Sequence, residues 1–138
     1  MKRKVSVNDR YLSVIKKVQG MNIMHPNEDC SEMAERVVRT INRGYLVTFF
    51  AKTLSGNIAE FNLPLPLSGK YYYHTVCITK FNGVKIVIDL MCVPRVMLYT
   101  DYVNKLKSNN LNNIRLYVTK GDVGQKVVYR KEITGELI

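Results

Sequence analysis

The chain has 138 residues, of which 46% are hydrophobic and 23% are charged. This length fits one domain spanning residues 1–138 that buries a core without disulfides, and the composition excludes a disordered chain. No apolar run approaches the ~18 residues that a membrane span requires. The basic start, Met1 to Lys4, leads into polar residues rather than an apolar segment, so we expect no signal peptide.

The formal net charge is +10, because 21 Lys and Arg stand against 11 Asp and Glu. These basic residues are scattered, and such a surface favours anionic partners: nucleic acid, an acidic protein or a membrane face. Solubility alone is an equally good explanation. Three cysteines without a CxxC spacing and only two histidines predict no disulfide framework, no metal site and no cofactor. We expect a monomer that works in reducing surroundings.

The first predicted element is a helix. Asn8 or Asp9 is a candidate cap, an apolar stripe follows, and the helix is expected to run to about Gln19 and to end at Gly20. Residues 21–29 are predicted to form a loop.

The second predicted helix, from Cys30 to Arg43, has the clearest pattern in the sequence. Asn27 and Asp29 are its candidate N-caps, and Gly44 is expected to end it. At 100° per residue its apolar residues share one face: Cys30, Met33, Ala34, Val37, Val38 and Ile41. The pattern therefore predicts Cys30 in the first turn of the helix and within its buried stripe.

The rest of the chain is predicted to be β structure with one further helix, which makes the fold class α+β. Thr100 or Asp101 is a candidate cap for that helix, which is expected to run through Lys107. A long loop, with room for a short strand, is expected over residues 55–69. The predicted strands cover residues 45–51, 71–81, 84–91, 114–119 and 126–133.

Asn82-Gly83 separates two apolar runs and predicts a two-residue hairpin turn. In that register Phe81 faces Val84, so the numbers of paired residues sum to a constant. His74 and Asp89 then share a face as diagonal neighbours, close enough for their side chains to touch. A register change of one residue would place them on opposite faces.

Cys30, His74 and Asp89 supply a thiol, an imidazole and a carboxylate, which are the groups that nucleophilic catalysis by cysteine requires. Cys30 would act as a thiolate, favoured by the helix N-terminus. His74 would move the proton, and Asp89 would orient His74. Three nearby acids oppose this by raising the thiol pKa unless they face solvent: Glu28, Asp29 and Glu32.

A transient oxyanion needs hydrogen-bond donors, and the backbone N–H of Cys30 at the helix start is the natural first one. A side-chain amide from the preceding segment would be the second, and the sequence leaves Gln19, Asn22 and Asn27 as candidates.

Each of the three residues also has an ordinary structural interpretation, because a single cysteine on a buried helix face is more often a core residue than a nucleophile. Asp89, however, ends an apolar run in which a carboxylate needs a partner. The combination favours catalysis. Cys77 and Cys92 are interpreted as packing residues, and His25 as a loop residue, with a place at the mouth of the site as the alternative.

The order of these residues resembles the papain-like fold. A polar loop leads into a cysteine-led helix, a strand carries histidine (Tyr72-Tyr73-His74-Thr75-Val76), and a strand ending in aspartate follows Asn82-Gly83. Over residues 27–106 the chain is most similar to the compact papain-like toxin domains at the C-terminal ends of bacterial polymorphic and contact-dependent inhibition toxins.

The resemblance implies Cys30 as nucleophile, His74 as base and Asp89 as orienting residue, with the cysteine helix packed on an antiparallel sheet. It also implies delivery from a secreted or cell-surface parent protein into the cytoplasm of a target cell, a protein substrate there, and a cognate immunity protein. Two features depart from the family pattern: no Trp follows the cysteine, and Met24 stands where a Gln is expected.

The triad chemistry leaves peptide hydrolysis, glutamine deamidation, transglutamination and acyl transfer open, since all proceed through a thioester. The alternative is a small basic ribonuclease toxin that cuts tRNA or rRNA, with His25, His74 and basic residues acting on the phosphate. A third possibility is a basic binding module without chemistry, although no known nucleic-acid-binding motif supports it.

Overall fold

A computed structural model describes residues 7–22, 29–64, 70–110, 113–121 and 127–132. It contains three helices and a seven-stranded sheet in which every pairing between described strands is antiparallel, so the predicted α+β class is confirmed. In chain order the elements are α1 (Val7–Gln19), α2 (Cys30–Ile41), β1 (Tyr45–Thr53), β2 (Ile58–Ala59), β3 (Phe61–Asn62), β4 (Lys70–Tyr71), β5 (Tyr73–Phe81), β6 (Val84–Ile88), β7 (Val96–Leu98), α3 (Tyr99–Ser108), β8 (Ile114–Gly121) and β9 (Val127–Glu132).

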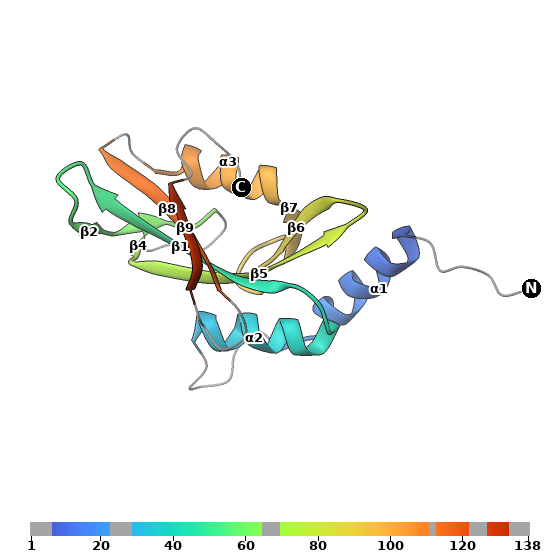
Figure 1. The fold of residues 1–138 in the computed structure, drawn as a ribbon. Helices are drawn as coiled ribbons and strands as arrows, with labels where there is room; N and C mark the ends of the chain where they lie inside the picture. Colours follow the sequence, from blue (N-terminus) through green and yellow to red (C-terminus); the bar gives the residue numbers. More distant parts are fainter. Residues whose placement is uncertain (1–6, 23–28, 65–69, 111–112, 122–126, 133–138) are drawn as a thin grey trace, which may run out of the picture.

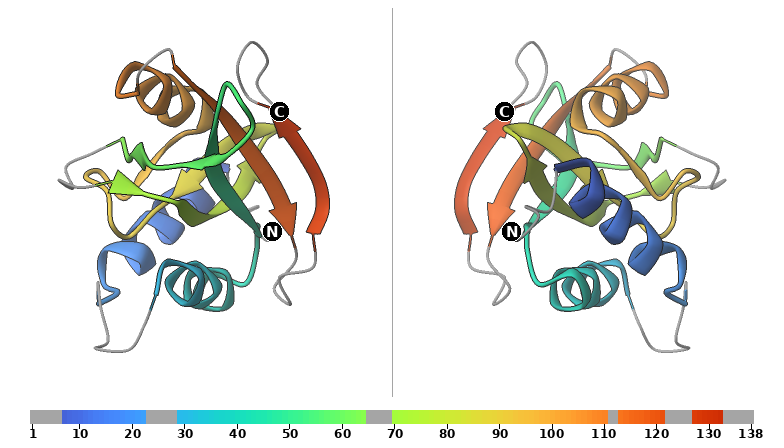
Figure 2. Two further views of the ribbon diagram at one scale, coloured as in Figure 1. Left: turned by 90° about the vertical axis from the view of Figure 1, so that its left-hand side faces the viewer. Right: turned by 90° about the vertical axis from the view of Figure 1, so that its right-hand side faces the viewer.

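The sheet has the strand order β7-β6-β5-β1-β8-β9, with β2 added to β1, and it lies between two helical layers. Figure 1 shows α3 above the strands and α2 below them, and the turned views in Figure 2 show α1 beside α2. Each layer has its own core. One packs α3 against Val47, Phe49 and Val87, and the other packs α1 and α2 against Leu46, Cys77 and Ile88.

Helix α2 forms as its sequence pattern predicts. Asp29 has an extended conformation, and its side chain accepts a hydrogen bond from the backbone N–H of Glu32 at 2.9 Å, which makes it the N-cap. The helix ends at Ile41, two residues earlier than predicted, because Asn42 adopts a left-handed conformation. The buried face of α2 packs on β5 and β1.

The hairpin between β5 and β6 has the predicted register. Phe81 pairs with Val84, and the pairing continues to Cys77 opposite Ile88. Asn82 and Gly83 both have positive φ, 53° and 81°, as a type I′ turn requires. The register that brings His74 and Asp89 to one face is therefore present.

Several predicted boundaries are wrong. The strand predicted to reach Met91 ends at Ile88, because the chain turns at Asp89, and β7 was not predicted. The strand predicted over residues 71–81 is interrupted at Tyr72, and α3 is capped at Leu98 rather than at Thr100 or Asp101, without a side-chain hydrogen bond. Helix α1 begins at Val7, so Asn8 and Asp9 lie inside its first turn rather than capping it.

Candidate active site

His74 and Asp89 form a direct contact inside the protein. His74 Nε2 lies 2.6 Å from Asp89 Oδ2, and both side chains are buried, with exposed fractions of 1% and 4%. His74 lies near the start of β5, and Asp89 directly follows the last residue of β6. The diagonal arrangement predicted from the hairpin turn thus leads to a hydrogen bond.

The carboxylate of Asp89 receives three further hydrogen bonds. The Tyr102 hydroxyl donates to Oδ2 at 2.9 Å from α3, and the Cys92 thiol donates to the same oxygen at 3.1 Å. The backbone N–H of Met91 donates to Oδ1 at 3.0 Å. A buried carboxylate needs such partners, and together they fix the position from which Asp89 can orient the His74 ring.

The end of β6 gives Asp89 this position. The backbone N–H of Asp89 donates to the Arg95 carbonyl at 2.8 Å, and Cys92 N–H donates back to the Asp89 carbonyl at 3.1 Å. The chain thus turns away from β5 instead of continuing the hairpin, so the pairing of β6 with β5 stops before Asp89. Strand β5 runs on past the end of β6 toward Tyr73.

Cys30 belongs to the helical layer of α1 and α2, on the other side of the sheet from α3, which supplies Tyr102. Cys30 is the first residue of α2, it is partly buried, and it lines one cavity with His74, which lowers the pKa of its thiol. Because Asp89 occupies Nε2, the remaining ring nitrogen, Nδ1, is the one available to the thiol. The next residue, Ser31, donates to the Thr75 hydroxyl at 3.3 Å and so links the start of α2 to β5.

The three groups shift one another's proton affinities. Burial alone would raise the pKa of Cys30, but hydrogen bonds from His74 and from the backbone of Thr75, with the charge of His74, lower it below its ordinary value. Burial opposes a charged imidazole, yet the charge of Asp89, its hydrogen bond and the contact with Cys30 raise the pKa of His74 to about 9. These directions favour a thiolate–imidazolium pair at neutral pH.

Asp89 is held in its charged form. Burial would raise its pKa, but the charge of His74 and hydrogen bonds from His74, Cys92 and Met91 lower it. The opposite holds for Cys77, because burial raises the pKa of that thiol to about 12. Cys77 is therefore an unreactive packing residue, as predicted.

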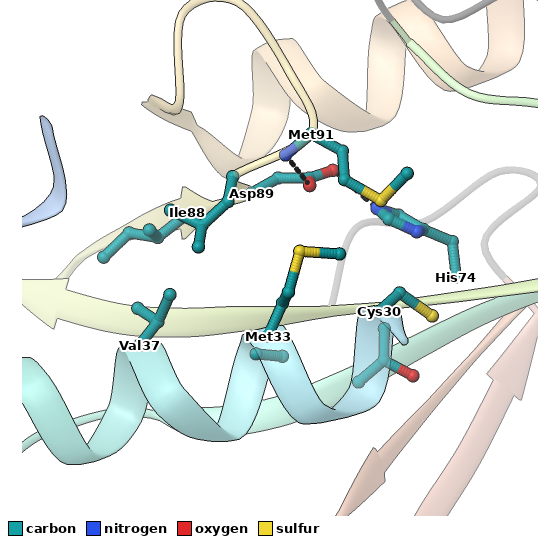
Figure 3. A pocket seen from close by; sticks show the side chains of 10 residues that line it. Cys30, Met33, Val37, His74, Ile88, Asp89 and Met91 are labelled. Atoms are coloured by element: carbon teal, nitrogen blue, oxygen red, sulfur yellow. Dashed lines mark hydrogen bonds and ion pairs between the residues drawn. The ribbon is translucent and has the colours of Figure 1, made fainter. Parts of the chain in front are cut away.

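A narrow cavity joins the three residues, as Figure 3 shows, with Cys30 at the start of α2, His74 across from it, and Met33 and Met91 beside them. Its volume is about 10 Å³, which is close to the room that one water molecule needs. The described residues that line it include no lysine or arginine. The cavity therefore has room for about one water-sized group beside the thiol, and its described lining offers no lysine or arginine to hold a phosphate.

The predicted oxyanion donors lie in different parts of the molecule. The N–H of Cys30 lies in the first turn of α2, where backbone N–H groups have no carbonyl partner within the helix. Gln19 is exposed at the end of α1 and lines a separate cavity with Cys92 and Arg95. The Asn22 carbonyl accepts from Arg36.

Asn27, His25 and Glu28 lie outside the described residues.

Two members of the site were not predicted from the sequence. Tyr102 lies on the buried face of α3 and Cys92 is interpreted above as a packing residue, yet both donate to Asp89. A tyrosine on a buried stripe usually needs a hydroxyl partner, which is the signal that could have identified Tyr102. The contribution of the Thr75 backbone has no sequence signal, since it depends on where β6 ends.

Within the described ranges, no cluster of three His, Cys, Asp or Glu side chains has the arrangement of a metal site. The described helices are all too short or too polar to cross a membrane. Comparisons of the chain with protein-family models, curated proteins and solved structures find no match.

Proposed function

We propose that this chain is a cysteine hydrolase that acts on a carbonyl group of a protein through a thioester on Cys30. The observation that carries the proposal is the continuous chain of contacts from Cys30 through His74 to Asp89. A structural cysteine does not need a buried imidazole whose pKa is raised by a carboxylate behind it. This alignment is the arrangement that an activated thiol requires.

In the proposed reaction, the Cys30 thiolate attacks the carbonyl carbon, and the charge that develops on the oxygen is stabilised by the backbone N–H of Cys30. His74 gives its proton to the leaving amine, and the thioester remains on Cys30. His74, now neutral, takes a proton from water as the water attacks the thioester, which releases the acid and restores the thiolate. Asp89 keeps the His74 ring in one orientation throughout.

The finer assignment is a papain-like toxin domain, and it is supported by the order of the elements. The helix that begins with Cys30 packs on an antiparallel sheet. His74 lies on β5 of this sheet, and Asp89 directly follows β6. This assignment includes delivery into a target cell, a protein target there that is cleaved or modified at glutamine, and a cognate immunity protein. The ribonuclease alternative is less well supported, because His74 is buried against Asp89 and the described residues that line the cavity include no lysine or arginine.

The test is to express the chain and its Cys30→Ser and Cys30→Ala variants in bacteria and to compare growth, the masses of cellular proteins and the integrity of tRNA and rRNA. The wild-type chain is expected to arrest growth and to leave either new protein fragments or proteins in which a glutamine amide has become a carboxylate. Both variants are expected to be inactive but folded.

Cys77→Ala is the matched control, since it also removes one thiol, and it is expected to keep activity if it folds. Growth arrest with cut RNA in the Cys30→Ala variant would reject the proposal in favour of the nuclease. A wild-type chain with no effect on protein or RNA would favour the binding module.

A further inference from the structure

The sheet face that carries Thr75 continues beyond the start of α2. Thr75 points toward α2, because its hydroxyl contacts Ser31, and the Thr48 hydroxyl lies 2.7 Å from it on β1. Alternate residues of a strand share a face, so Phe50 and Lys52 lie on the same side as Thr48. Figure 1 shows β1 and β8 extending past the light-blue end of α2, where Cys30 begins the helix.

The neighbouring strands complete two rows of side chains across this face. Phe50 pairs with Tyr73 of β5 and with Tyr117 of β8, and Lys52 pairs with Arg115 of β8. We call these five residues the aromatic–basic surface. The rings of Phe50 and Tyr117 stack with centroids 5.3 Å apart, and the Lys52 ammonium lies 5.6 Å from the Tyr117 centroid.

The surface is accessible at its outer positions. The Tyr73 side chain is 63% exposed, and Arg115 is also exposed, whereas Phe50 is 8% exposed and forms the floor. Packed rings with an open tyrosine beside them suit an apolar side chain of a partner, and two adjacent cations suit a carboxylate. The net charge of +10 also attracts acidic segments over a longer range.

The spacing connects this surface to the thiol. Thr75 lines the same cavity as Cys30, its hydroxyl contacts the next residue of α2, Ser31, and the aromatic row begins two residues along β5 at Tyr73. Two residues of a strand span about 7 Å. An extended peptide that offers a carbonyl to Cys30 would place an apolar side chain two positions away over the aromatic row, and an acidic side chain four positions away over the cations.

We infer that the aromatic–basic surface binds an extended polypeptide segment of the substrate in which an apolar and an acidic residue flank the attacked residue at these spacings. The inference rests on the proposed function, because the chemistry at Cys30 decides between protein and RNA. Aromatic rings beside cations would also suit single-stranded RNA, but a thiolate attacks a carbonyl carbon rather than a phosphate.

The test uses a symmetrical capped peptide, Glu-Gly-Phe-Gly-Gln-Gly-Phe-Gly-Glu, so that either chain direction presents the pattern. Its binding to the Cys30→Ala variant is measured by fluorescence anisotropy of a labelled copy. Its protection of Cys30 from iodoacetamide is measured in the wild-type chain by peptide mapping. We expect the peptide to bind and to slow alkylation, and the analogue with Lys in place of both Glu residues to do neither.

Reversing the two charges, Lys52→Glu with Arg115→Glu, is expected to weaken binding at least about tenfold and to abolish protection. The neutral pair Lys52→Gln with Arg115→Gln is expected to give an intermediate loss, which guards against misfolding of the reversed variant. Lys16→Glu with Lys17→Glu changes the same amount of charge at exposed positions on α1 and is expected to keep both binding and protection.

Equal peptide binding by the two charge-reversed variants would overturn the inference, as would the absence of binding. A nine-nucleotide oligouridine that binds instead of the peptide, and loses binding in the Lys52→Glu/Arg115→Glu variant, would assign the surface to RNA. Failure of the proposed function has a different signature, because Cys30 alkylation without any peptide would then be no faster than that of an ordinary thiol.

Discussion

At the scale of single residues, the site depends on how many groups hold one carboxylate oxygen. Asp89 Oδ2 accepts from His74, Cys92 and Tyr102, and these come from β5, the turn after β6 and α3. The contact between His74 and Asp89 could be predicted, because an Asn-Gly turn fixes the register of a hairpin. The contact with Tyr102 could not, because no sequence pattern gives the rotation of α3 above the sheet.

Replacement of Asp89 by Asn is expected to slow alkylation of Cys30 at pH 7 by about tenfold and to lower the free energy of unfolding by about 2 kcal/mol. Without the charge of Asp89, the pKa of His74 falls toward its ordinary value, so the imidazolium that stabilises the thiolate is lost. The measurements are the pH profile of iodoacetamide labelling and urea unfolding.

Tyr102→Phe is a milder change at the same carboxylate. It removes one donor to Asp89 and is expected to cost about 1 kcal/mol, with a smaller shift of the labelling profile in the same direction. Tyr99→Phe makes the same chemical change in the first turn of α3 and is the control. An equal shift of the profile in both tyrosine variants would contradict a positioning role for Tyr102.

At the scale of elements, the N-terminus of α2 determines where Cys30 lies, the nucleophile of the proposed function. Its start, its cap and its buried face followed from the sequence, because apolar periodicity and the cap preference of Asp29 agree. The ends of β5 and β6 did not follow from the sequence. Val84 to Met91 has the composition of a strand throughout, but its pairing with β5 stops at Ile88 and the chain turns between Asp89 and Cys92.

Two substitutions at Asp29 separate its roles. Asn keeps the cap but removes a charge that raises the pKa of Cys30, so Asp29→Asn is expected to move the labelling profile to lower pH with little change in melting temperature. Asp29→Ala removes both and is expected to cost about 1 kcal/mol of stability. Equal melting temperatures for the two variants would show that the cap does not stabilise α2.

At the scale of the whole molecule, the buried pair of His74 and Asp89 makes stability depend on pH. The pKa of His74 is raised to about 9 in the folded chain, so its contribution is complete below the ordinary histidine pKa and is lost as the pH rises through 9. The pKa of Asp89 is lowered, so its contribution is present above the ordinary aspartate pKa and is lost in acid.

We therefore expect the free energy of unfolding to fall by about 1–2 kcal/mol between pH 7 and pH 9.5. The double variant His74→Gln with Asp89→Asn, which places neutral side chains of similar shape at both positions, is the control and is expected to vary less over this range. Urea unfolding at each pH gives both values. Parallel curves for the two proteins would mean that the pair does not set the pH dependence.

The residues around Cys30 come from distant parts of the chain, which matters for when its thiol meets the groups that lower its pKa. Cys30 belongs to the first quarter of the sequence, whereas its base, the orienting acid and the helix that holds this acid come from residues 74, 89 and 102. Strand β1, which lies beside the histidine strand, is flanked on its other side by β8, which begins only at Ile114. A chain still being synthesised, or one that has lost these contacts, lacks the groups that lower the pKa of Cys30, so under the proposed function its thiol stays inactive until residues 74, 89 and 102 have folded around it.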